Sequence, residues 1–142
     1  MKQLPEAALL QLKMNSKAGR EKWKDGDLNE AERYFLEAWE AIPEPKNEYD
    51  YTQSLSRGFI VFYRDTSQFE KAKYWLNVMR AAYGSEASDY VDFTAATVYF
   101  AAGELDAAFQ IFDTQFKKYK SRPFQGEDKK YLDFYKERVA RK

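Results

Sequence analysis

Apolar side chains recur at steps of three and four residues along most of this chain, and this spacing constrains the fold more than any other feature of the sequence. Residues three and four apart share one face of an α-helix, whereas a half-buried strand alternates at every second residue. The sequence has no alternating stretch of useful length. The spacing therefore predicts an all-α fold.

Glycine and proline are few, and they divide the apolar pattern into seven predicted helices. Pro5 suits the first turn of the first helix, which should end at the turn signal of residues 25–27. Pro43 and Pro45 should stop the second helix, because proline cannot continue one. The remaining expected helices lie at about residues 47–64, from 67 to Gly84, from 88 to Gly103, from 104 to Pro123, and at about 127–140.

Side chains that can cap helices stand at three of the predicted starts. Asp27 with Glu30, and Ser67 with Glu70, have the spacing of a capping box, in which a short polar side chain accepts from the third backbone N–H of the helix. They predict the starts of the second and fourth helices. Ser88 or Asp89 is expected to cap the fifth helix.

The turn and second helix of each predicted pair repeat along the chain. Residues 26–31, 67–72 and 103–108 align so that a small residue recurs in register at Ala31, Ala72 and Ala108, 41 and 36 residues apart. A large apolar residue follows each alanine by four positions. Paired helices need small residues where their axes cross closely, so the pattern predicts stacked helix pairs.

The first unit resembles the tetratricopeptide repeat (TPR) family, because its small, aromatic and turn residues stand at that family's spacing: Gly19, Gly26, Ala31, Phe35, Ala38 and Pro43. The resemblance implies antiparallel helix pairs stacked as a short right-handed superhelix within a single domain, residues 1–142. About three repeats are expected, at residues 12–45, 53–86 and 89–122, followed by a capping helix at 127–140.

Composition excludes several classes of function. The chain has no histidine and no cysteine, so it lacks the commonest general bases, transition-metal ligands and activated nucleophiles. It also has no glycine-rich phosphate loop. We therefore expect a protein that is not an enzyme and needs no metal or other cofactor.

The expected setting is the cytoplasm. The N-terminal residues contain only four consecutive apolar residues, 7–10, which is too short for a secretory signal, and no stretch approaches a membrane span. The absence of cysteine fits a reducing compartment. The 23 basic and 23 acidic residues give a net charge of zero, which argues against nucleic acid or an anionic membrane as the partner.

The TPR resemblance implies that the first helix of each pair lines a concave groove that binds a partner protein or peptide. The groove residues that follow from it are Lys13, Lys17, Arg20, Lys24, Arg57, Arg64, Tyr90, Phe93 and Thr97. Such a groove would be basic at one end and aromatic at the other. It would suit an acidic segment with an apolar anchor, because Arg pairs with carboxylates and aromatic pockets are strong contact points.

Three alternatives stay open at this stage. Small single domains without cysteine also serve as immunity or antitoxin proteins that neutralise bacterial toxins. The same basic residues, with aromatic side chains to stack bases, would suit a regulatory RNA-binding helical repeat, although net neutrality argues against it. Self-association through an exposed end of the helical array is compatible with any of these functions.

Overall fold

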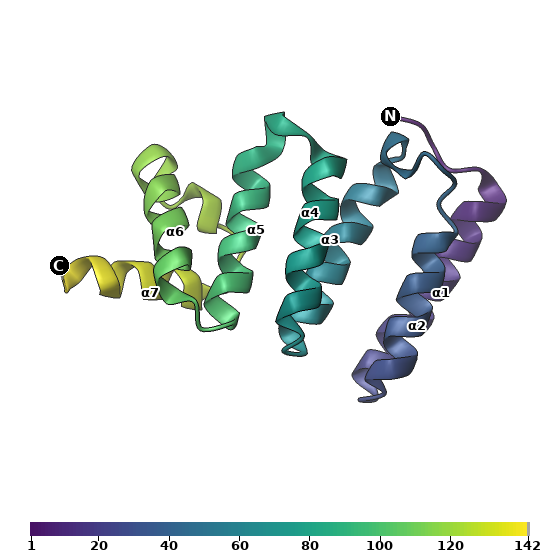
Figure 1. Cartoon of the computed structure of the whole chain (residues 1–142), viewed down its shortest axis with the longest axis horizontal. Helices are drawn as coiled ribbons and strands as arrows, with labels where there is room; N and C mark the ends of the chain where they lie inside the picture. Colours follow the sequence, from purple (N-terminus) through teal and green to yellow (C-terminus); the bar gives the residue numbers. More distant parts are fainter. Residues whose placement is uncertain (142) are drawn as a thin grey trace. The chain divides into compact units, whose positions relative to one another are not determined.

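The computed structural model describes residues 1–141, and within them the chain forms seven α-helices joined by short connections (Figure 1). The fold class predicted from the apolar spacing is confirmed. The helices are α1 (Glu6–Lys24), α2 (Leu28–Glu40), α3 (Asp50–Asp65), α4 (Phe69–Tyr83), α5 (Ser88–Ala101), α6 (Leu105–Tyr119) and α7 (Lys129–Ala140). Three single 3₁₀ turns lie between them, η1 (Lys46–Glu48), η2 (Ser85–Ala87) and η3 (Arg122–Phe124).

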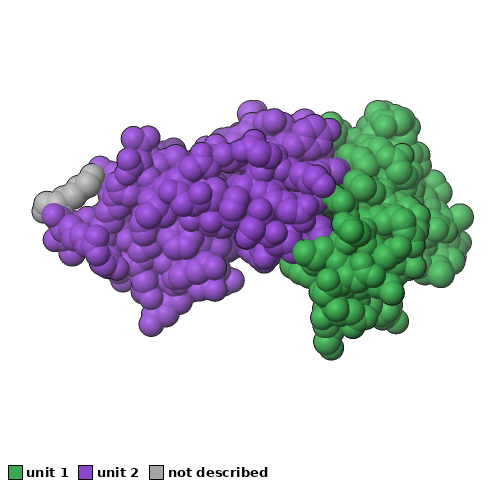
Figure 2. All heavy atoms as spheres, turned by 60° about the horizontal axis from the view of Figure 1, so that its bottom comes forward, with its two compact units in different colours: residues 1–59 green, residues 60–142 purple. Residues whose placement is uncertain are grey.

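The helices group into two compact units, Met1–Phe59 and Ile60–Lys142, which we call unit 1 and unit 2 (Figure 2). Unit 1 holds α1, α2 and the first part of α3, and unit 2 holds the rest of α3 with α4 to α7. Helix α3 runs without interruption through Gly58.

Unit 1 is built on a close contact between α1 and α2. Gly19 of α1 lies against the ring of Phe35, so near that a Cβ at position 19 would stand 2.5 Å from a ring carbon. Ala31 and Ala38 of α2 are fully buried. Trp23 meets the same Phe35 ring edge to face at 6.4 Å. The small residues thus let the two helices approach, and the aromatic side chains fill the space beside them.

Three helix-to-helix turns share one backbone conformation. Gly26, Ser67 and Gly103 all have a positive φ, at +85°, +59° and +81°. The preceding helix ends with the same backbone hydrogen bonds each time, and the residue after the positive-φ position occupies the N-cap position of the next helix. This is the left-handed helix end that glycine adopts most easily. The alignment of segments 26–31, 67–72 and 103–108 therefore corresponds to a repeated local structure.

The same turn overturns one predicted cap. Ser67 occupies the left-handed position, so Gln68 becomes the N-cap of α4 and makes no side-chain capping bond. The expected capping box of Ser67 and Glu70 is wrong for this reason. Asp27 does cap α2, since its side chain accepts from the N–H of Glu30.

Three further helix starts differ from the prediction. Helix α3 begins at Asp50 and not near residue 47, which lies in η1. Helix α5 follows directly on η2, with Ala87 at the N-cap and Ser88 already helical, so neither Ser88 nor Asp89 caps it. Helix α7 begins at Lys129, because the side chain of Asp128 accepts from the N–H of Lys130 and caps it there. The same few residues can form either a turn or a helix cap, and the local sequence does not determine which of the two forms.

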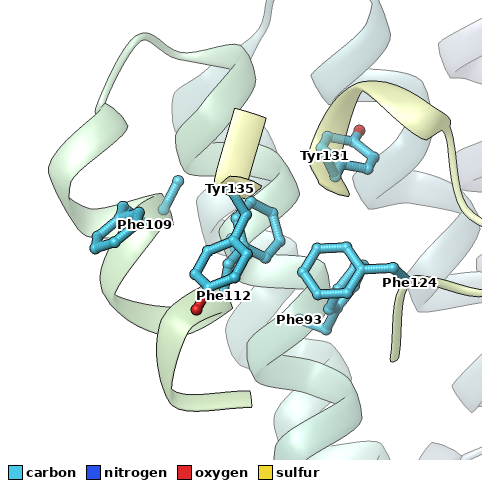
Figure 3. Packing of buried hydrophobic residues seen from close by; sticks show 8 residues of the cluster. Phe93, Phe109, Phe112, Phe124, Tyr131 and Tyr135 are labelled. Carbon is cyan, nitrogen blue, oxygen red and sulfur yellow. The ribbon is translucent and has the colours of Figure 1, made fainter. Parts of the chain in front are cut away.

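Unit 2 is closed by an aromatic core at its C-terminal part. Figure 3 shows rings from α5, α6, η3 and α7 turned toward one another, and Figure 1 shows α7 crossing α6 instead of running alongside it. Phe112 is fully buried at the centre, within 5.3 to 5.9 Å of the rings of Phe93, Phe124 and Tyr131. Tyr135 stacks on Phe109 at 5.5 Å. Helix α7 thus covers the apolar side of α5 and α6.

Candidate interaction surface

Four basic side chains form a row along α1. Lys13, Lys17, Arg20 and Lys24 are separated by steps of four, three and four residues, and all four are exposed. Steps of this size keep side chains on one face of a helix, so the row runs about 16 Å along the axis. We call these four residues the α1 basic row.

The α1 basic row has no internal counter-charge. None of its members forms an ion pair with any of residues 1–141. Some basic residues elsewhere are paired, as the Nζ atom of Lys2 lies 3.0 Å from a Glu48 oxygen and that of Lys73 lies 2.8 Å from a Glu104 oxygen. The positive charge of the α1 basic row is therefore directed at solvent.

Charge is separated between the two helices of the first pair. Helix α1 carries five basic and two acidic residues, whereas α2 carries one basic and four acidic residues. On α2 the single basic residue, Arg33, lies 2.7 Å from both Glu30 and Glu37 and so neutralises part of the acidic helix. Net neutrality of the whole chain thus conceals a local positive field on α1.

Helical spacing within α1 gives the α1 basic row no clear role in stabilising its own helix. The row contains three like-charge pairs at steps of three or four residues, each costing about 0.2–0.5 kcal/mol, and Glu21 offsets them in part because it lies at such steps from Lys17 and Lys24. Folding alone would favour carboxylates at some of these positions. An exposed row of cations that forms no ion pair within the described residues is a candidate for contact with another molecule.

Two apolar side chains adjoin the α1 basic row. Leu10 is 61% exposed and Met14 is 60% exposed, one helical turn apart. Steps of three and four residues connect them to Lys13 and Lys17, so the four side chains form a single patch on the exposed face of α1. Sequence analysis did not select Leu10 and Met14 as candidate surface residues. Helical spacing places them away from the buried residues of α1, and this could have identified them.

The buried side of α1 contains two unsatisfied polar groups. Asn15 is 7% exposed, and its Nδ2 atom has no hydrogen-bond partner among residues 1–141. The Oγ atom of the half-buried Ser16 likewise has none there. Both residues lie between Met14 and Lys17 in sequence, and Ser16 lies one turn from Lys13 and from Arg20. Sequence reasoning missed Asn15. Its position three residues after the buried Leu12 indicated that its side chain would be buried.

The two other predicted basic residues are not exposed as the α1 basic row is. Arg57 is half-buried in unit 1. In unit 2 the side chain of Arg64 is only 14% exposed, and it donates to both carboxylate oxygens of Asp65 and to Oγ1 of Thr97. Burial disfavours the charged guanidinium, but the hydrogen bond and charge of Asp65 raise the pKa of Arg64. Arg64 therefore serves an internal network of unit 2.

The predicted aromatic end of the groove is mostly interior. Tyr90 is exposed and lies 5.4 Å from the ring of Tyr83. Phe93 and Thr97 are 5% and 2% exposed, contrary to the expectation that they face a partner. Seven residues of α5 between positions 91 and 98 are buried, because the helix is covered on nearly all sides. Its nearly continuous apolar sequence was the signal for this burial.

The described residues offer no metal site and no membrane span. Within residues 1–141 no three potential metal-ligating side chains of His, Cys, Asp or Glu lie together. In that part of the chain no helix has both the length and the hydrophobicity to cross a bilayer. Comparison with protein-family models, with characterised proteins and with solved structures finds no match to the chain.

Proposed function

We propose that this protein is a non-catalytic interaction module that binds a partner protein through the α1 basic row. The observation that carries the proposal is the row itself, four exposed cations on one helix face with no carboxylate paired to them among the described residues. Desolvated pairs between arginine or lysine and carboxylates give both affinity and partner choice. The partner should therefore present an acidic segment.

A TPR-like stacking of helix pairs is part of this proposal. The three turns of one backbone conformation support it, together with the fully buried alanines that follow them, Ala31, Ala72 and Ala108. Phe35, Leu76 and Phe112, four positions further on, are all buried. In such arrays the first helix of a pair is a common place for a partner to bind, which agrees with the position of the α1 basic row.

The experiment is affinity capture from native cells with mass spectrometry. Full-length wild type is compared with a variant in which Lys13, Lys17, Arg20 and Lys24 are each changed to Glu. Since the four positions are exposed, the variant should keep its fold, which circular dichroism checks. We expect one partner to be recovered by the wild type and to fall at least about tenfold with the variant.

A matched control reverses four other exposed basic residues, those at Lys120, Arg122, Lys129 and Lys136 in unit 2. Both variants have the same net charge, so a non-specific effect of charge would appear in both. Capture that survives reversal of the α1 basic row would refute the proposal. Recovery of RNA in place of a protein would instead support the RNA-binding alternative.

A further inference from the structure

The two exposed apolar residues beside the α1 basic row constrain the shape of the partner, and the row itself constrains its charge. Leu10 and Met14 form a ridge of two apolar side chains one turn apart, and the cations continue from this ridge toward the C-terminal end of α1. From this arrangement we propose that the occupant is an acidic amphipathic helix lying antiparallel along α1. This inference rests on the proposed function and specifies its partner.

The exposed face of α1 suits a helix better than an extended peptide. An extended peptide leaves its backbone N–H and C=O groups to be satisfied, and extended segments are usually bound through main-chain hydrogen bonds. Helix α1 has two amide side chains, of which Asn15 is buried, so that Gln11, one turn from Met14, is the one exposed amide of this helix that can bond to a peptide backbone. A helical partner satisfies its own backbone and needs only side-chain contacts.

The spacing of the cations agrees with a helical partner. Successive members of the α1 basic row are about 4.5–6 Å apart along the axis, because each residue adds about 1.5 Å. Carboxylates at steps of three and four residues on a second helix repeat at the same interval. On an extended strand, same-face residues repeat at about 6.6 Å, which falls out of register over four positions.

The order of the patch along α1 gives the direction of the partner. The apolar pair lies in the N-terminal half of α1, and the cations extend to its C-terminal end at Lys24. An antiparallel partner would place its carboxylates near its own N-terminus and its apolar anchor further along. Acidic residues are favourable at a helix N-terminus, so charge pairing and the helix dipole act in the same direction.

A second copy of the chain matches the patch less well. The acidic helix of this protein is α2, and its exposed Leu36 could act as an anchor. Two of its four carboxylates, those of Glu30 and Glu37, already hold Arg33 at 2.7 Å. The charge complementarity therefore favours a different protein over self-association.

The test uses a fluorescent 18-residue peptide that carries Glu at steps of three and four residues in its first three turns and a Leu pair one turn apart after them. Its control has the same charge and composition except for two central prolines, which prevent a helix. Binding to the full chain is measured by fluorescence anisotropy at low and high salt. We expect the proline peptide to bind at least about tenfold more weakly.

Two double variants of the protein test whether Leu10 and Met14 contact the partner. Leu10 and Met14 are both changed to Ser, and the matched control changes Leu28 and Leu36 of α2, which are 38% and 40% exposed. We expect the first pair to weaken binding of the helical peptide about tenfold, since two apolar contacts are lost, and the second pair to have little effect.

Several outcomes would overturn the inference. Equal binding of the helical and proline peptides would leave charge as the only requirement, and failure of both peptides would reject the helical partner. In either case, capture of a cellular partner that still depends on the α1 basic row would keep the proposed function. A dimer that is seen by light scattering and dissociates when the row is reversed would assign the patch to a second copy.

Discussion

Units 1 and 2 use their charged residues in different ways. In unit 1 the charges are separated, with the α1 basic row on one helix and four acidic residues on the next. In unit 2 oppositely charged side chains pair across neighbouring helices, as Arg80 with Asp92 at 3.0 Å and Lys73 with Glu104 at 2.8 Å. These paired charges of unit 2 connect its own elements, whereas the α1 basic row is available to another molecule.

The two units differ in the packing of their cores as well as in the arrangement of their charges. Unit 2 closes around a dense cluster of rings, and α7 covers the side of α5 and α6 that would otherwise be open. Unit 1 has a smaller cluster of buried residues around Leu12, Ala38 and Ile42, together with the close contact between Gly19 and Phe35. We therefore expect substitutions in the ring cluster to affect stability most, and substitutions on the exposed face of α1 to affect binding most.

The largest expected effect is on the core of unit 2. Phe112→Ala should destabilise the protein by about 3–5 kcal/mol, because it removes a fully buried ring and leaves a cavity. Denaturant unfolding followed by circular dichroism measures the change. Leu105→Ala on the same helix is the control, since Leu105 is 41% exposed and should cost about 1 kcal/mol or less. Similar losses for both variants would show that the ring cluster is not the stabilising core.

Alkaline pH should weaken the same cluster. Burial and the hydrogen bond to Asp113 raise the pKa of Tyr135 to about 12, and burial raises the pKa of Tyr131. The unfolded phenol titrates near pH 10, so the stabilising effect is complete below pH 10 and is lost as pH rises from about 10 to 12. For Tyr135 the loss is on the order of 2 kcal/mol.

Unfolding in denaturant at several pH values measures this loss. In Tyr135→Phe, most of the decline between pH 10 and 12 should disappear, because phenylalanine has no proton to release. The absorbance of tyrosinate gives an independent titration of the wild type. An unchanged decline in the variant would mean that Tyr135 does not couple folding to pH.

Two glycines of unit 1 should respond in opposite directions to alanine. Gly19→Ala should cost about 1–2 kcal/mol, because the new Cβ would meet the Phe35 ring at 2.5 Å. Gly58 lies within α3 with no atom within 4 Å of the position of a Cβ, so Gly58→Ala should stabilise by about 0.5–1 kcal/mol. Thermal unfolding of both variants decides the matter, and equal shifts would argue against the close approach of α1 and α2.

The smallest expected effect concerns the α1 basic row. Lys13→Glu should stabilise the protein by about 0.5 kcal/mol, because it replaces the like-charge pair of Lys13 and Lys17 by an opposite pair. The same substitution should weaken binding of the acidic peptide. Chemical unfolding and peptide binding are measured on one preparation. Loss of stability would contradict the view that the row is kept at a cost to folding.

Much of the fold was predictable because local rules determine it. The apolar spacing predicted seven helices, and the turns at Gly26, Gly84 and Gly103 were readable from glycine. The capping box at Ser67 was wrong, since Ser67 takes the left-handed position that glycine holds in the two corresponding turns. A residue that can occupy either of two local structures is assigned by the packing of the helices on each side.

The candidate surface was predictable only in part. Lys13, Lys17, Arg20 and Lys24 were expected on one face and are exposed there, because helical spacing alone determines which residues share a face. Phe93 and Thr97 were expected at the other end of the same groove, but they are buried in unit 2. Helical spacing states which residues lie together on a helix and says nothing of what covers them.

The sequence by itself determined the helices, the repeated turns and the separation of charge between α1 and α2, since each depends on residues close together in the chain. Only the tertiary structure decided which faces are covered and which side chains are buried. Arg64 and Arg20 both precede a carboxylate in the sequence, yet the Arg64 side chain is only 14% exposed and donates to Thr97, 33 positions away, while Arg20 is exposed. Burial and such long-range hydrogen bonds depend on neighbours that folding brings from distant positions, which is why they could not be read along the chain.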